Sequence, residues 1–134
     1  MKIKEVAEAL ERFAPLPLQE GYDNAGLQVG LTAAEASGVL LCLDVTPEVI
    51  REAVAMECNM VVSHHPLLFR GLKRIADDTL VERCVREAIL GGVALYAAHT
   101  NLDNALGGVN HRIAEMLGLG DVEFLEPASD GQSG

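Results

Sequence analysis

Three short, continuous apolar runs alternate with longer amphipathic segments through the middle of this chain. The runs cover residues 39–43, 60–62 and 93–98. Such runs are typical of strands buried on both faces, and each is followed by a segment with helical spacing of apolar residues. Because strand–helix–strand crossovers are right-handed and make neighbouring strands parallel, we predict an α/β fold with a mainly parallel β-sheet covered by helices.

The helices are predicted from the spacing of apolar side chains and from capping residues. Thr46 followed by Pro47 is a typical helix start directly after the first strand. Residues 21–30 hold three glycines and an Asp-Asn pair, which favours a turn-rich loop that leads into a short extended piece. The predicted helices cover residues 2–14, 47–57, 78–90 and 108–117.

A chain of 134 residues fits one domain with a single hydrophobic core. We expect an α/β domain over residues 1–120. Residues 121–134 end in a polar stretch rich in turn-forming residues, so we expect a polar tail or a truncated linker there.

Composition argues against several classes of partner. The net charge of −10 opposes the phosphate backbone of nucleic acids, and the densest basic cluster, residues 70–74, is expected to be a solvated loop. No apolar stretch is long enough to span a membrane, and the N-terminus develops no signal-peptide h-region. We therefore expect a cytoplasmic protein that binds neither nucleic acid nor membranes, and three structural cysteines.

Polar, chemically capable residues follow two of the predicted strands. Ser63-His64-His65-Pro66 comes after the second strand, and His99 and Asp103 come after the third. Because ligands bind at the carboxyl edge of strands in open α/β sheets, we expect these side chains to gather there. Imidazole nitrogens and a carboxylate are ligands for zinc, iron, manganese or nickel, which predicts a metal-binding domain.

Alternatives remain open for single residues. Side chains alternate along a strand, so His64 and His65 are expected to serve two ions or two sides of one cavity, and either could simply bond to backbone. His99 could be a ligand, a proton shuttle or a structural loop residue. Asp44 could orient a ligand imidazole or favour the following helix N-terminus. His111 is expected to face solvent.

The motifs taken together resemble the NGG-one-interacting-factor-three-like family, whose members are often labelled GTP cyclohydrolase I type 2 homologues. The resemblance covers nearly the whole chain, with the motifs in the family's order. Besides the N-terminal helix, it rests on residues 22–30, 43–46, 63–67, 99–103 and 118–127.

The resemblance implies a dinuclear metal centre whose N-terminal ligands fall on His64, His65 and Asp103, with His99 lining the same pocket in a catalytic role. Family members add a His and a Glu from a C-terminal segment and assemble into ring-shaped hexamers, so a homo-oligomer is expected. The chain ends near Gly134, about where the family's first half ends, and those two ligands have no counterpart here. Either the chain is truncated or the second half is another polypeptide.

The functional hypothesis is a metal-dependent hydrolase-like protein that uses a divalent ion to activate water toward an unknown small-molecule substrate. Nothing in the sequence recognises guanine or a triphosphate. The alternative is a non-enzymatic metal-binding scaffold or interaction protein. We expect the chain alone to be weakly active or inactive, because the second ion would lack protein ligands.

Overall fold

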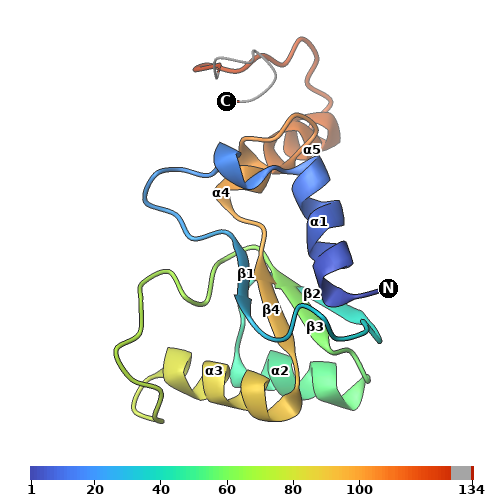
Figure 1. Cartoon of the computed structure of the whole chain (residues 1–134). Coiled ribbons are helices and arrows are strands. Elements are labelled where there is room, and N and C mark those ends of the chain that lie inside the picture. Colours follow the sequence, from blue (N-terminus) through green and yellow to red (C-terminus); the bar gives the residue numbers. More distant parts are fainter. Residues whose placement is uncertain (128–133) are drawn as a thin grey trace.

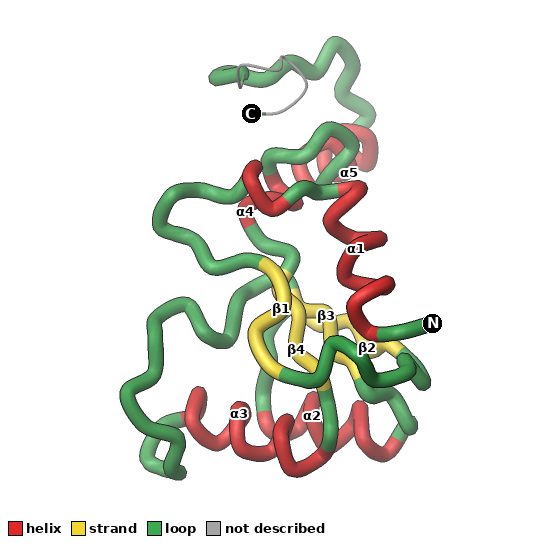
Figure 2. Tube along the Cα trace, viewed as in Figure 1, coloured by secondary structure: helices red, strands yellow, loops and turns green. Residues whose placement is uncertain are grey.

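A four-stranded mixed sheet forms the centre of the computed structural model, which describes residues 1–127 and 134 (Figures 1 and 2). The strand order is β1-β4-β3-β2. Strands β2 (Val39–Cys42), β3 (Met60–Ser63) and β4 (Ala94–Ala97) are parallel, and β1 (Gly26–Val29) pairs antiparallel with β4. The predicted α/β class with a mostly parallel sheet is confirmed, and the extended piece after the glycine-rich loop is the antiparallel edge strand.

Helices cover the two faces of the sheet unequally. Helices α2 and α3 lie side by side on one face, and α1 lies on the other (Figure 1). The chain caps α2 with Thr46, whose side chain accepts a hydrogen bond from the amide of Val49, as the sequence predicted. The helices are α1 (Ile3–Phe13), the 3-10 turn η1 (Leu16–Leu18), α2 (Pro47–Ala55), α3 (Leu80–Gly91), α4 (Thr100–Asp103) and α5 (Val109–Met116).

Alternation along the parallel strands separates two apolar clusters. Val61 and Leu95 face α2 and α3, whereas Met60, Val62 and Tyr96 face α1. Successive strand residues point to opposite faces, so a fully apolar strand supplies both clusters. This explains why the strands read as continuous apolar runs rather than as an alternating pattern.

Strand β2 is an open edge of the sheet and is covered on only one face. Leu41 lies on the face that α1 covers elsewhere, and its side chain is 74% exposed. Leu43, just beyond the strand, is also exposed. Helix α1 packs against side chains of β1, β3 and β4, and among the described residues no β2 side chain belongs to this apolar cluster.

Helix α5 departs from the predicted packing. The helical spacing of Val109, Ile113, Met116 and Leu117 predicts that these side chains face inward. Ile113, Met116 and Leu117 are instead exposed, and Ala114 is the buried residue of the helix. Periodicity identifies the apolar face of a helix but not whether another element covers it. Residues 121–127 form no helix or strand, and the rest of the predicted tail, residues 128–133, lies outside the described residues.

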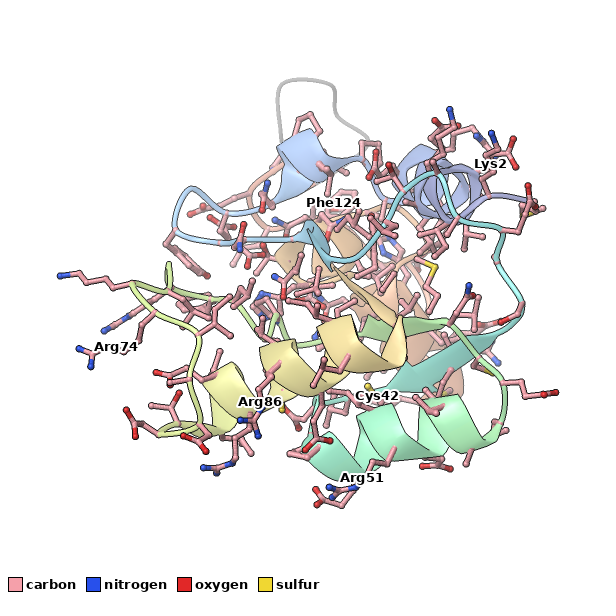
Figure 3. The ribbon with its side chains drawn as sticks, turned by 60° about the horizontal axis from the view of Figure 1, so that its bottom comes forward. Lys2, Cys42, Arg51, Arg74, Arg86 and Phe124 are labelled. Carbon is pink, nitrogen blue, oxygen red and sulfur yellow. The ribbon has the colours of Figure 1, made fainter. Side chains whose placement is uncertain are left out.

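Three arginines lie at the periphery of the molecule. Arg51 and Arg86 project from α2 and α3, and Arg74 projects from the loop between β3 and α3 (Figure 3). Arg51 pairs with Glu87, and Arg86 pairs with Asp77. Within the described residues, no helix is both long and apolar enough to cross a membrane.

Candidate metal centre

The parallel register of β3 and β4 places the candidate residues at one edge of the sheet. Ser63, the last residue of β3, is paired with Ala97, the last residue of β4. His64 and His65 follow the first of these strands directly, and His99 follows the second after one intervening residue. The expected gathering at the carboxyl edge is therefore present.

The three imidazoles lie close together. Their ligand nitrogens fall within 4.8 Å of one another. The ring centroids of His64 and His65 are 5.1 Å apart, and those of His64 and His99 are 5.3 Å apart. Strand β3 ends before His64, so strict alternation no longer separates the two adjacent histidines and both rings reach the same space.

Each of the three rings is held through Nδ1 by an oxygen acceptor. The pairs are His64 with the carbonyl oxygen of Ala98 at 2.9 Å, His65 with Asp44 Oδ1 at 2.8 Å, and His99 with Asp23 Oδ1 at 2.8 Å. Carbonyl and carboxylate oxygens only accept hydrogen bonds, so Nδ1 is the protonated nitrogen in each ring. A neutral ring then carries its free lone pair on Nε2, which is the arrangement of imidazoles that bind metals.

Asp103 adds a carboxylate beside this cluster. Its Oδ1 lies 3.8 Å from Nε2 of His64, which is too long for a hydrogen bond. Two ligand atoms at this separation can both contact one ion between them, because bonds to zinc are about 2.0–2.2 Å long. Both side chains are about three-quarters buried, and the donor set of imidazole nitrogens and one carboxylate fits a divalent metal.

Asp23 is a site residue that the sequence analysis missed. Its side chain is 0% exposed and receives hydrogen bonds from His99 Nδ1, from the Thr100 amide and hydroxyl, and from the Asn24 amide. Burial alone would raise the pKa of Asp23, but these donors outweigh it and hold the pKa below its ordinary value. The ionised carboxylate therefore fixes both the orientation and the tautomer of His99.

The signal for Asp23 in the sequence was weak. The Asp-Asn pair in the glycine-rich loop indicated a turn, and nothing local connects it with His99, which lies 76 positions away. Asp44 was recognised as a possible orienting residue, and the structure places it against His65. His111 was expected to face solvent, but it is partly buried against Phe124, with ring centroids 5.2 Å apart.

The cluster is open on one side. The His65 side chain is about half exposed, and those of His64 and His99 are more buried. The ring of Phe69 lies 6.5 Å from that of His99, and Tyr22 lies 6.4 Å from Phe69. Solvent therefore reaches the cluster at His65, and Phe69 lies beside His99.

Comparison with known families places the chain. A profile of the DUF34/NIF3 (NGG1p interacting factor 3) family matches residues 1–133. The chain belongs to the DUF34/NIF3 family. This confirms the resemblance drawn from the motifs.

Several DUF34/NIF3 relatives are similar over almost the whole chain. It is 43% identical over 119 residues to the GTP cyclohydrolase 1 type 2 homolog of Clostridium perfringens, and 39% identical over 125 residues to that of Clostridium acetobutylicum. These matches cover 89% and 93% of the chain. The crystal structure of a Bacillus cereus protein related to NIF3 superimposes with a TM-score of 0.89 at 40% identity, over 96% of the chain.

The chain is shorter than these DUF34/NIF3 proteins. It spans 45% and 47% of the two clostridial relatives and 35% of the Bacillus cereus chain.

Proposed function

We propose that this chain is the metal-holding part of a metal-dependent hydrolase-like protein, with His64, His65 and Asp103 as ligands. The observation that supports this most is the set of three adjacent imidazoles that use Nδ1 for an oxygen acceptor and keep Nε2 free. A bound zinc, iron, manganese or nickel ion would supply Lewis acidity that lowers the pKa of water and polarises an electrophile.

His99 has a separate role in this proposal. Its Nδ1–H is held by the buried carboxylate of Asp23, which stabilises the ring when it gains a proton. Nε2 of His99 can therefore take a proton at the open side of the cluster and return it. The pairing resembles a carboxylate–histidine pair in general acid–base catalysis, in which the carboxylate fixes the tautomer.

The activity of the chain by itself should be low. The relatives named as GTP cyclohydrolase 1 type 2 homologs are about twice as long as this chain. Within the chain, the ligands His64, His65 and Asp103 suffice for one firmly held ion. A second ion would lack enough protein ligands to compete with water. We expect a segment equivalent to the second half of the relatives to complete the centre.

Metal retention by four alanine variants tests the ligand assignment. After loading with zinc and dialysis, His65→Ala and Asp103→Ala should lose most of the bound zinc, whereas His99→Ala should keep it. His111→Ala is the matched control, since its ring packs against Phe124 outside the cluster. Elemental analysis gives the zinc per chain, and equal retention in all four variants would refute the ligand set.

Stoichiometry and turnover test the enzymatic part. The chain alone should bind one zinc firmly and show little turnover of p-nitrophenyl acetate, bis(p-nitrophenyl) phosphate or GTP. Adding the second half of the Clostridium perfringens relative should raise both values. Two firmly bound ions in the chain alone would contradict the ligand set, and an inert complete assembly would favour a metal-binding scaffold.

A further inference from the structure

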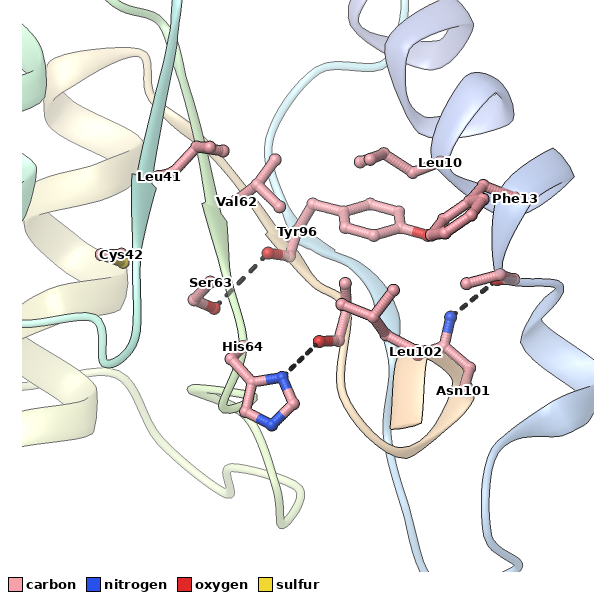
Figure 4. A pocket seen from close by; sticks show the side chains of 12 residues that line it. Leu10, Phe13, Leu41, Cys42, Val62, Ser63, His64, Tyr96, Asn101 and Leu102 are labelled. Carbon is pink, nitrogen blue, oxygen red and sulfur yellow. Dashed lines mark hydrogen bonds between the residues drawn. The ribbon is translucent and has the colours of Figure 1, made fainter. Parts of the chain in front are cut away.

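An apolar pocket adjoins the histidine cluster on the side of the sheet that α1 covers. It has a volume of about 300 Å³, which is within the range of small-molecule sites. Its walls come from the end of α1, the three parallel strands and α4, and Figure 4 shows them from close by. Phe13, Leu41, Val62 and Leu102 supply much of the apolar surface, and His64 lies at one end.

One buried polar atom in this pocket has no partner among the described residues. Tyr96 is 1% exposed, and its hydroxyl forms no hydrogen bond within the described part of the chain. Its ring extends from β4 toward α1, with the hydroxyl on the side of Leu10 and Phe13 (Figure 4). A buried hydroxyl without a partner costs free energy, so native proteins seldom leave one unpaired unless another molecule satisfies it.

The other polar side chains along the pocket are already paired. Ser63 donates its hydroxyl proton to the carbonyl oxygen of His65, and Asn101 donates to the carbonyl oxygen of Ala14 (Figure 4 shows the latter). Nδ1 of His64 is taken by a backbone carbonyl. Nε2 of His64 is assigned to the metal in the proposed function, so the Tyr96 hydroxyl is the polar group left for an occupant.

The charge of the side chains that line the pocket limits which molecules can bind there. Among the described residues, no Asp, Glu, Lys or Arg lines the pocket, so a phosphate or a carboxylate would enter it without a counter-charge. Burial raises the pKa of Tyr96 to about 12, so the hydroxyl keeps its proton at neutral pH and can donate. Binding at that hydroxyl requires the ring of Phe13, which is 55% exposed, to move aside.

We propose that this pocket binds a neutral, planar ring with a carbonyl oxygen or ring nitrogen that accepts a hydrogen bond from Tyr96. The proposal rests on the proposed function, because the ring would be the non-reacting part of the substrate and would place the scissile bond at the His64 end. A triphosphate would have to remain outside the pocket. The occupant is a small molecule, because the pocket of about 300 Å³ has the volume of a small-molecule site and offers one buried hydrogen-bond donor.

Two probes of equal size test the pocket. Coumarin is a neutral planar bicycle with a carbonyl acceptor, and naphthalene has the same shape without one. Titrated into ¹⁵N-labelled chain, both should shift the amide signals of Leu41, Val62 and Leu102. Tyr96→Phe should weaken coumarin binding about fivefold, the value of one hydrogen bond, and leave naphthalene binding unchanged. Removing an unpaired buried hydroxyl should not impair folding, which thermal unfolding checks.

A second pair of variants tests whether the probes bind in this pocket or elsewhere on the protein surface. Leu41→Asp should abolish binding of both probes, and Leu90→Asp, at an exposed site on α3, should change neither. Shifts elsewhere, or equal effects of Tyr96→Phe on both probes, would overturn the proposal. A dimer that Leu41→Asp dissociates in light scattering would also overturn it, because a second copy would then cover the pocket.

Metal content separates this test from that of the proposed function. Both titrations are run on chelator-treated and on zinc-loaded protein. Coumarin binding that depends on Tyr96 in the metal-free chain supports the pocket even if the zinc retention test fails. Firm zinc binding without Tyr96-dependent coumarin binding overturns the pocket and leaves the proposed function standing.

Discussion

Asp23 and Asp44 make the same contact in different surroundings, which allows a sharp stability prediction. Each carboxylate accepts a hydrogen bond from a histidine Nδ1 at 2.8 Å. The Asp23 side chain is 0% exposed, whereas that of Asp44 is 63% exposed. Replacing each by alanine therefore removes the same histidine contact from a buried site and from an exposed site, and at Asp23 it also removes the acceptor of the Thr100 amide.

The magnitude follows from the groups left behind. Asp23→Ala removes the acceptor of the His99 ring and of the Thr100 amide, both partly buried. Hydrogen bonds to a charged acceptor are each worth about 1.5–3 kcal/mol, so the loss should be about 3 kcal/mol of the free energy of unfolding. Asp44→Ala removes an exposed pair that water replaces, and it should cost below about 1 kcal/mol.

Urea unfolding followed by circular dichroism measures the difference. A chelator in the buffer keeps bound metal from contributing to either value. Equal losses for the two variants, or a larger loss for Asp44→Ala, would refute the argument that burial determines the strength of these contacts.

Two further predictions concern other parts of the sheet. In a Tyr22→Phe background, ultraviolet absorbance should show Tyr96 ionising near pH 12, because folding raises its pKa from 10.0. The contribution of the neutral Tyr96 hydroxyl to the free energy of unfolding is therefore complete below pH 10 and is lost as the pH rises toward 12. Ionisation of Tyr96 below its ordinary value would contradict its burial. Gly30→Ala should destabilise the chain by about 3 kcal/mol in urea, since Gly30 has φ +118° and an added Cβ would lie 2.6 Å from Ala94 Cα. Gly71→Ala, where an added Cβ meets nothing within 4 Å, is the control and should have little effect.

The sequence alone determined the elements that depend on local patterns. Continuous apolar runs predicted the three parallel strands, and capping residues such as Thr46 predicted helix starts, because both signals lie within a few residues of the element they define. His64, His65 and His99 could be placed at one edge of the sheet for the same reason. Each directly follows a strand or nearly so, and parallel strands end at a common edge.

Only the tertiary structure decided which distant groups meet. Asp23 reaches His99 because β1 pairs antiparallel with β4 and returns its preceding loop to the histidines, a pairing that no local pattern specifies. Likewise, the sequence indicated Tyr96 as a core residue. That its hydroxyl has no partner among the described residues depends on α1 and α4, which come from opposite ends of the chain. Local periodicity defines the faces of each element, whereas long-range packing determines what each face meets.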